Sequence, residues 1–388
     1  MRIAIFSDTF PPEVNGVANY VYLSAKALAE REHEVQVFTA SRISQKKLNE
    51  KTDGKFKIFT VPSLRSPIYA DTRIPFPSGI TFSHILKFRP QVIHAHTPFT
   101  FGWGAVMGAK ILKIPLIGTH HTFYDHFLKH AKIDFQVARR ATWKYTISFY
   151  NFCDLVTAPS QSLAKEMKNH GLKKPIIVLP NFVNTDLFQP ATKIKKNKLK
   201  KQFALRGQSI VYMGRLSYEK NIDQIVRAFK IAAKKRPDLK LMLIGDGPEK
   251  NNLKKLVRKM GLVKKIIFTG FLRGENLVRA LQANDIFVTA SQTETFCIAA
   301  LEALAVGLPV VAAKEKGLQE LIQDKKNGFL VNPNSPREIA QSILEIFSNK
   351  KILNSFSQAA RLSAANHSRE KEIENLENIY LKLAKVKK

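Results

Sequence analysis

Apolar and polar positions along the first half of the chain follow two patterns, short apolar runs and amphipathic segments. Short apolar runs rich in β-branched and aromatic residues predict buried strands at 2–8, 34–40, 55–62, 91–98, 114–121 and 154–160. Amphipathic segments separate several of these runs, and the one at 21–32 has the period of a helix. Strands that alternate with helices are typical of a parallel α/β sheet.

The alternation of predicted strands and helices starts again in the second half. Further strands are predicted at 209–216, 240–247, 265–270, 285–290, 309–313 and 328–333, with helices at 221–235, 249–261 and 295–307. Prolines, turn formers and a dense lysine cluster at 178–203 indicate a linker between the two halves. A chain of 388 residues suits two domains. We therefore expect an α/β protein with domains at 1–185 and 186–370, and a final helix at 371–388 that returns to the first domain.

Charge and composition narrow the classes of partner. The chain has 62 Lys and Arg residues against 31 Asp and Glu, a net charge of +31, which predicts an anionic partner. The two cysteines, Cys153 and Cys297, indicate neither a disulfide framework nor a metal site, so a reducing cytoplasmic setting is expected. No signal peptide is apparent, and no run approaches the roughly 18 apolar residues of a spanning helix. Any contact with a membrane is therefore expected at its surface.

Two glutamates stand at unusual places around the predicted helix at 295–307. Glu294 precedes an apolar run and Glu302 lies within it, where a carboxylate is costly unless it is hydrogen-bonded. If the helix starts near Thr295, the free N–H groups of Thr295, Phe296 and Cys297 form an anion site suited to a diphosphate. Glu294 could then accept hydrogen bonds from sugar hydroxyls, and Glu302 could hold a ribose diol.

Glu294, seven residues and Glu302 together resemble the E-x7-E signature of the retaining glycosyltransferases of family 4. The resemblance covers nearly the whole chain and implies the GT-B fold, in which two Rossmann-like doubly wound domains face each other across a cleft. It assigns the first domain to the acceptor and the membrane, the second to the nucleotide sugar, and Glu302 to the ribose. The family usually has glycine where this chain has Cys297.

Further motifs fit the same family. In "VYMGRLSYEKNID" the resemblance places Arg215 and Lys220 on the leaving diphosphate, where cations offset the developing charge. Residues near the ends of predicted strands, and one in the first loop, complete the expected donor site: Gly16, Gly214, Gly245, Gly270 and Phe271. Each of these glycines, and Phe271, is also compatible with a purely structural role.

The segment "GTHHTFYDHF" carries three histidines within seven residues. It lacks the H-E-x-x-H spacing of a zinc site, so metal binding is not expected. The resemblance instead places His121 near the reacting carbon of the donor sugar, where an imidazole could orient a hydroxyl. The chain also has no D-x-D pair after a strand, so we expect no cofactor and no divalent cation, with Arg215 and Lys220 taking the place of a metal.

Basic and aromatic side chains interleave over residues 127–152. Such a pattern suits an anionic lipid interface, and it is also compatible with a helix that packs its aromatics into the domain. The residues expected at a membrane surface are Lys129, Lys132, Arg139, Arg140, Trp143 and Lys144.

Taken with this segment, the chain most resembles the diacylglycerol glucosyltransferase branch of the family. That implies a hexosyltransferase of the inner membrane face that moves glucose from UDP-glucose to 1,2-diacylglycerol with an α-linkage. A GDP-mannose-dependent α-mannosyltransferase acting on a phosphoinositide or another lipid is the alternative, because E-x7-E does not distinguish the sugars. A nucleic-acid-binding protein is the alternative from another class. The spread of the basic residues over both domains and the lack of a nucleic-acid-binding motif argue against it.

Overall fold

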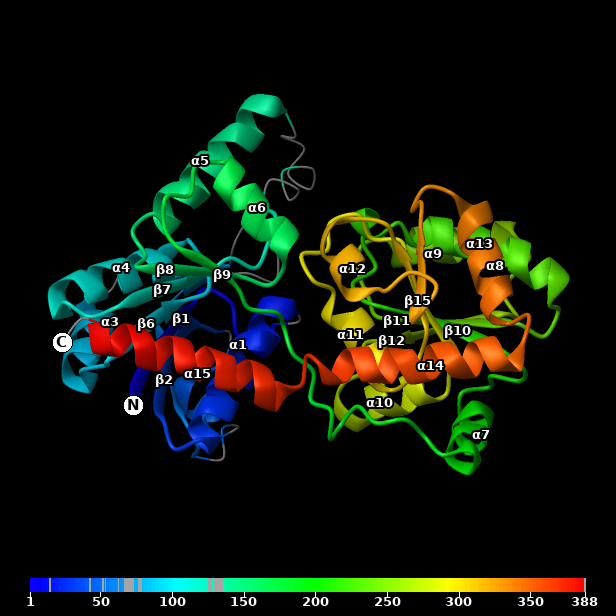
Figure 1. Ribbon diagram of the computed structural model, residues 1–388, viewed down its shortest axis with the longest axis horizontal. Coiled ribbons are helices and arrows are strands. Elements are labelled where there is room, and N and C mark those ends of the chain that lie inside the picture. Colours follow the sequence, from blue (N-terminus) through cyan, green and yellow to red (C-terminus); the bar gives the residue numbers. More distant parts are fainter. Residues whose placement is uncertain are drawn as a thin grey trace. The chain divides into compact units, whose positions relative to one another are not determined.

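The structure, a computed structural model, describes residues 1–386 except 14, 42, 51, 53, 62, 66–72, 76–78, 125–127 and 129–134. The chain forms two compact units (Figure 1). The first unit comprises Met1–Asn181 together with Glu370–Lys388, and the second comprises Phe182–Arg369.

The first unit is built on a parallel sheet. Within the described residues its order is β3-β2-β1-β6-β7-β8-β9, and every neighbouring pair is parallel. These strands are β1 (Arg2–Ser7), β2 (Glu34–Ala40), β3 (Lys57–Val61), β6 (Val92–Ala95), β7 (Leu116–Thr119), β8 (Leu155–Ala158) and β9 (Ile176–Val178). β4 (Ser63–Arg65) and β5 (Arg73–Pro75) form a separate antiparallel pair. Each strand predicted in this half is present, and β9 is an edge strand that the apolar pattern missed.

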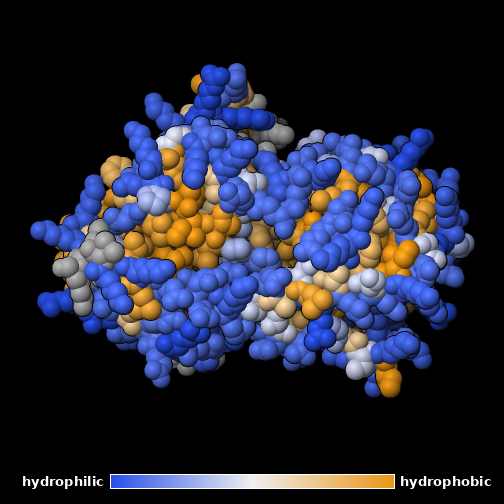
Figure 2. Space-filling view, viewed as in Figure 1, coloured by the Kyte–Doolittle hydropathy of each residue, from blue (hydrophilic) through white to orange (hydrophobic). Residues whose placement is uncertain are grey.

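Helices of the first unit cover this sheet. They are α1 (Gly16–Glu30), α2 (Gln45–Glu50), α3 (Gly79–Phe88), α4 (Thr100–Leu112), α5 (Gln136–Tyr150), α6 (Gln161–Asn169) and α15 (Arg369–Val386). The central strands β6, β7 and β8 are buried along their whole length, as expected for a sheet covered on both faces. In the view of Figure 2, apolar side chains gather over the part of this unit where Figure 1 draws β7, β8 and β9.

The second unit repeats the plan with a sheet ordered β12-β11-β10-β13-β14-β15, again wholly parallel. Its strands are β10 (Ser209–Met213), β11 (Lys240–Ile244), β12 (Ile266–Gly270), β13 (Ile286–Thr289), β14 (Val310–Ala313) and β15 (Gly328–Val331). Its helices are α7 (Lys193–Gln202), η2 (Tyr218–Lys220), α8 (Ile222–Lys235), α9 (Lys250–Lys259), α10 (Gly274–Gln282), α11 (Ile298–Ala305), α12 (Lys316–Leu321), α13 (Pro336–Ile346) and α14 (Lys350–Ala365). Every strand predicted in this half is present.

Both sheets have the order of a doubly wound fold, which confirms the predicted α/β class. In each sheet the strand order reverses beside the first strand, between β1 and β6 in the first unit and between β10 and β13 in the second. Ligands of such folds bind beyond the carboxyl ends of the strands at this point. The residues that follow these four strands are therefore where a site is expected.

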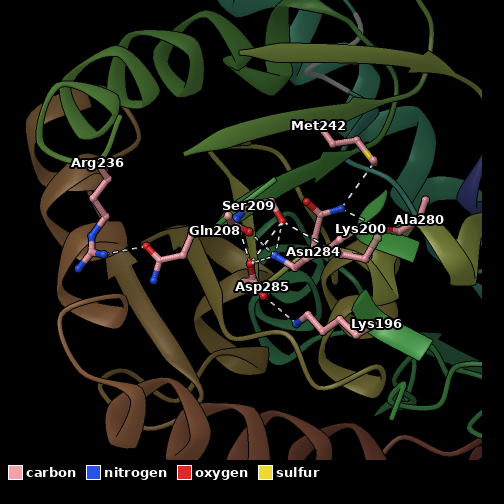
Figure 3. Close-up of polar contacts among 11 residues, drawn as sticks. Lys196, Lys200, Gln208, Ser209, Arg236, Met242, Ala280, Asn284 and Asp285 are labelled. Atoms are coloured by element: carbon pink, nitrogen blue, oxygen red, sulfur yellow. Dashed lines mark hydrogen bonds and ion pairs between the residues drawn. The ribbon is translucent and has the colours of Figure 1, made fainter. Parts of the chain in front are cut away.

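The segment predicted as a linker, 178–203, is mostly not one. Residues from Phe182 onward belong to the second unit, and α7 is fixed to that unit by a buried carboxylate (Figure 3). Asp285 accepts from Lys196 Nζ at 2.8 Å, from Lys200 Nζ at 2.5 Å and from the backbone N–H of Ser209 at 2.9 Å. Two of the lysines that resembled a solvated linker thus have a partner far along the chain.

The charges of this cluster are maintained by their mutual attraction. Burial by itself would raise the pKa of Asp285, but the two lysines outweigh it and lower the pKa. Burial lowers the pKa of Lys200, and Lys196 adds to that effect against the attraction of Asp285. The cluster lies at the amino ends of β10 and β13, at the opposite edge of the sheet from the switch point.

None of the helices in the described part of the chain has the length and apolar character of a membrane span.

Candidate active site

Three glycines line the carboxyl edge of the second sheet. Gly214 directly follows β10, Gly245 directly follows β11, and Gly270 ends β12. Backbone hydrogen bonds join them: Gly214 N donates to Ile244 O at 3.0 Å, and Gly245 N donates to Gly270 O at 2.9 Å. The structure thus brings these three predicted donor-site residues together on adjacent strand ends.

Position 245 has no space for a side chain, so it requires glycine. Its φ is 136°, and a Cβ at this position would lie 1.9 Å from the carbonyl oxygen of Gly214. No side chain fits without moving the backbone of the neighbouring strand. The glycine therefore permits a close approach between two strand ends, which a longer residue would force apart.

An ion pair spans the switch point of this sheet. Lys220 ends η2 after β10, Glu294 lies in the loop after β13, and Lys220 Nζ is 2.6 Å from Glu294 Oε1. Burial by itself would lower the pKa of Lys220, but the Glu294 carboxylate outweighs it and raises the pKa. Burial by itself would raise the pKa of Glu294, but Lys220 outweighs it and lowers the pKa. Both side chains therefore stay charged, and each fixes the position of the other.

Two residues that the sequence reasoning missed hold this pair in place. Asn221 donates from Nδ2 to the carbonyl oxygen of Ala290 at 3.2 Å and so ties η2 to the end of β13. The backbone N–H of Gly317 donates to Glu294 O at 3.2 Å. A Cβ on Gly317 would lie 2.1 Å from Thr295 O, so only glycine permits this contact. Asn221 follows Lys220 within "EKN", which could have drawn attention to it, whereas Gly317 had no comparable signal.

The helix after Glu294 begins later than predicted. α11 starts at Ile298, not near Thr295, because Cys297 has a left-handed φ of 69° and caps the helix. The helix amides without an intrahelical partner are consequently those of Ile298 and Ala299, directly after Cys297. Thr295 and Phe296 lie in the preceding loop, and the side chain of Phe296 is buried in the core. The geometry also explains why glycine suits position 297, since it adopts positive φ without strain.

Glu302 lies in the middle of α11 and is partly exposed, with Leu301 and Ala303 buried on either side. Burial raises the pKa of its carboxyl group to about 8. No hydrogen bond or ion pair to this group is present among the described residues. An acid of this kind is suited to bind hydroxyl groups of a ligand.

Two other predicted donor-site residues also lie at this edge. Arg215 directly follows Gly214 and is half-buried, and Phe271 directly follows Gly270 and is 49% exposed.

In the first unit, the carboxyl edge of the sheet is also polar and buried. Asp8 follows β1, and Thr97 follows β6 and donates its hydroxyl to Asp8 Oδ2. Asp8 also accepts from the backbone N–H of Phe101 at the start of α4. Burial raises the pKa of Asp8 to about 6, although these hydrogen bonds oppose the shift. Gly16 is the first residue of α1, next to the capping residue Asn15.

His121, after β7, belongs to a cluster of neutral histidines. Its Nε2 lies 2.9 Å from His96 Nδ1, and the ring of Tyr20 packs against it with centroids 5.1 Å apart. Burial lowers the pKa of His121 to about 3, so the ring is neutral at pH 7. The adjacent His120 packs instead against rings of α5, with centroids 5.1 Å from Tyr150 and 5.9 Å from Trp143.

The structure corrects part of the predicted membrane-facing segment. Trp143 is 7% exposed and stacks on His170, so it is a packing residue. Arg140 and Lys144 are exposed on α5, and Arg139 is half-buried. Lys129 and Lys132 lie outside the described residues. The large apolar side chains that are exposed on and beside α4 and α5 are Phe99, Met107, Ile111, Phe135, Val137, Tyr145 and Phe152.

No three His, Cys, Asp or Glu side chains of the described residues are arranged to hold a metal ion.

Comparisons with known proteins identify the family and the fold of the chain. Residues 14–187 match the family model described as Glycosyltransferase Family 4, and residues 193–363 match Glycosyl transferases group 1. The chain is 31% identical to alpha-monoglucosyldiacylglycerol synthase of Streptococcus pneumoniae, over 89% of this chain and 78% of that protein. It is 29% identical to a GDP-mannose-dependent alpha-mannosyltransferase of Corynebacterium glutamicum, over 86% and 77%. The solved structure of Anabaena Alr3699/HepE in complex with UDP has a TM-score of 0.81 at 20% identity, with 99% of this chain and 100% of that chain covered.

The left-handed backbone at Cys297 predicts that glycine is more stable than alanine at this position, the opposite of the order in a helix interior. Cys297→Gly should be about 1 kcal/mol more stable than Cys297→Ala, because alanine keeps the strain of a positive φ and glycine removes it. Urea denaturation measures the difference. Ala303→Gly, in the interior of the same helix, is the control and should lose about 1 kcal/mol or more. An alanine variant more stable than the glycine variant at position 297 would contradict the described start of α11.

The raised pKa of Glu302 predicts that the free energy of unfolding depends on pH. The folded-state pKa of about 8 exceeds the ordinary value of 4.5, so the folded protein binds the Glu302 proton more tightly than the unfolded chain does. The contribution of this proton to the stability of the fold is complete below pH 4.5 and is lost as the pH rises through 8. The free energy of unfolding of the wild type, relative to Glu302→Gln, should therefore fall by up to about 1.4 kcal/mol per pH unit between these values. Denaturant titrations of both proteins at pH 5, 7 and 9 measure it. A difference that does not vary with pH would contradict the burial of this carboxyl group.

Proposed function

The chain belongs to glycosyltransferase family 4, as its two-glutamate motif predicted, and we propose that it transfers glucose from UDP-glucose to a membrane diacylglycerol with an α-linkage. It has the GT-B fold and is a hexosyltransferase. The observation that carries the proposal is the Lys220–Glu294 ion pair at the switch point of the second sheet. Glu302, which has no hydrogen bond or ion pair among the described residues, lies about one turn along the adjoining helix.

The second unit has the groups that a nucleotide sugar requires. Lys220 and Arg215 are cations beside the glycine-lined strand ends, where they can bind the diphosphate. Glu302 has carboxyl oxygens available for the ribose hydroxyls, and the exposed ring of Phe271 lies at the same edge for the base. The relative of known structure was solved with UDP bound, which supports a nucleotide donor.

We assign the chemistry to residues as follows. Arg215 and Lys220 offset the negative charge that develops on the diphosphate as the bond between the sugar carbon and the phosphate oxygen breaks. Glu294, oriented by Lys220, accepts hydrogen bonds from sugar hydroxyls. His121 binds another hydroxyl group of the sugar. The acceptor hydroxyl attacks the face from which UDP leaves, and its proton passes to the departing phosphate oxygen. This same-face substitution retains the configuration and assigns no step to a divalent cation.

Exposed side chains on the first unit support the assignment of a lipid acceptor. Val137 and Tyr145 are exposed on α5, the helix that also carries the exposed Arg140 and Lys144. Exposed apolar and basic side chains on one helix are the combination that favours an anionic membrane surface. The Streptococcus pneumoniae relative is named for a product built on diacylglycerol. We therefore place the protein on the membrane surface during the reaction.

Release of UDP from UDP-glucose, measured in EDTA with liposomes, tests the proposal. We expect release that requires diacylglycerol and is faster on anionic than on neutral liposomes. Replacing Arg140 and Lys144 by glutamate should remove most of the anionic advantage, because each basic residue at such a surface contributes about 1 kcal/mol. The matched control replaces Lys234 and Lys235, exposed on α8 of the second unit, by glutamate and should keep that advantage.

Two results would contradict the proposal. Transfer from GDP-mannose to a phosphoinositide, without transfer from UDP-glucose to diacylglycerol, would favour the mannosyltransferase alternative that the Corynebacterium glutamicum relative represents. Activity that stops in EDTA and returns with a divalent cation would contradict the role given to Arg215 and Lys220.

A further inference from the structure

The loop after β10, which carries the two cations assigned to the diphosphate, is attached to the neighbouring strand end. Gly214 N donates to Ile244 O at 3.0 Å, and Leu216 N donates to Asp246 O at 2.9 Å. Ile244 ends β11, and Asp246 lies in the loop that follows it. The backbone is therefore fixed on both sides of Arg215.

A buried tyrosine of the strand holds the peptide group between these two attachments. The hydroxyl of Tyr212, on β10, donates to Arg215 O at 3.0 Å, and the backbone N–H of Ser217 donates to the same oxygen at 3.1 Å. Tyr212 is only 1% exposed. Because a ring packed in the core has little freedom to move, its hydroxyl is a fixed point for the carbonyl group of Arg215.

Gly214 makes this contact possible. A Cβ at position 214 would lie 2.8 Å from Tyr212 Oη and 3.3 Å from Tyr212 Cζ. The hydroxyl therefore occupies the space that a side chain at position 214 would need. The φ of Gly214, 154°, also favours glycine, so two separate constraints act on this residue.

The hydroxyl of Tyr212 stays protonated and remains a donor. Burial raises the pKa of Tyr212 well above its usual value, and the negative charge of Glu294 adds to the shift. The bond to Arg215 O is therefore present over the whole physiological range of pH.

We propose that Tyr212 is a positioning residue for the transfer, because its hydroxyl fixes the peptide group of Arg215 and with it the origin of the guanidinium side chain. The part that concerns the diphosphate rests on the proposed function, whereas the fixed peptide group does not. Arg215 offsets charge that develops as the bond breaks. Loss of its position should therefore lower kcat and leave the KM for the donor nearly unchanged.

A double-mutant cycle of urea denaturation tests the geometry without any activity. Gly214→Ala should lower the urea midpoint more in the wild type than in Tyr212→Phe, because the variant ring lacks the oxygen that a Cβ would meet at 2.8 Å. Equal shifts in the two backgrounds overturn the proposal.

The wild type alone provides a second test, which holds even where a variant fails to fold. In a nuclear magnetic resonance spectrum of the protein with 13Cζ-labelled tyrosine, in equal parts of H2O and D2O, a slowly exchanging hydroxyl gives separate O–H and O–D signals. We expect two signals for Tyr212 and one averaged signal for Tyr218, which is 74% exposed. One averaged signal for Tyr212 overturns the proposal.

Kinetics with radiolabelled UDP-glucose and diacylglycerol liposomes test the positioning role. Tyr212→Phe should lower kcat about tenfold and keep the KM for UDP-glucose within about twofold. In an Arg215→Ala background the same substitution should change kcat by less than about twofold, because the side chain that Tyr212 positions is absent. Equal losses in the two backgrounds, or an unchanged kcat in Tyr212→Phe, overturn the role.

Asn284→Ala is the matched control for a loss of stability alone. Asn284 Nδ2 donates to Ala280 O at 2.8 Å, at the amino edge of the same sheet (Figure 3). Asn284→Ala should lower the urea midpoint and keep kcat within about twofold. A loss of kcat as large as that of Tyr212→Phe overturns the specific role of Tyr212.

The readouts separate this inference from the proposed function. Coupled stabilities of Tyr212 and Gly214 variants, in a protein that transfers no sugar to any lipid, contradict the function and support the fixed peptide group. Active transfer with the same kcat in the wild type and in Tyr212→Phe supports the function and contradicts the positioning role.

Discussion

The ion pair between Lys220 and Glu294 is the interaction on which the second unit's site depends. It joins the loop after β10 to the loop after β13, the two strands between which the sheet order reverses. Burial opposes the charge of each side chain, and the charge of the partner outweighs that effect. Together they remain ionised, and Asn221 and Gly317 fix the loops that carry them. The pair therefore presents an ordered cation and an ordered anion beside the strand ends that carry Gly214, Gly245 and Gly270.

The two units use opposite electrostatics for related tasks. In the second unit, charged groups at the strand ends suit a diphosphate, whose negative charge grows during the reaction. In the first unit, burial keeps His94, His96, His120 and His121 neutral, since it lowers the pKa of each. Neutral imidazole rings can form hydrogen bonds with hydroxyl groups without contributing a charge.

Much of the fold was predictable from the sequence because buried parallel strands are apolar along their whole length. β6, β8, β13 and β14 are examples, and each was located from its run of aliphatic residues. The spacing of Glu294 and Glu302, together with the motif that carries Arg215 and Lys220, indicated the family before any geometry was known. What could not be predicted depends on contacts between distant residues or on backbone angles. Asp285, distant in sequence, pairs with Lys196 and Lys200 of α7, and the left-handed φ of Cys297 delays the start of α11. Likewise, Trp143 is buried by His170.

The most direct test of the central claim is a calorimetric titration of UDP and of uridine into the wild type and into Lys220→Met, all in EDTA. The account predicts that UDP binds the wild type without a metal. It also predicts that Lys220→Met weakens UDP binding by about tenfold to a hundredfold, because one charged contact to the diphosphate is lost. Uridine, which has no phosphate, should bind both proteins equally. An unchanged affinity of Lys220→Met for UDP, or UDP binding that requires a divalent cation, would contradict the account.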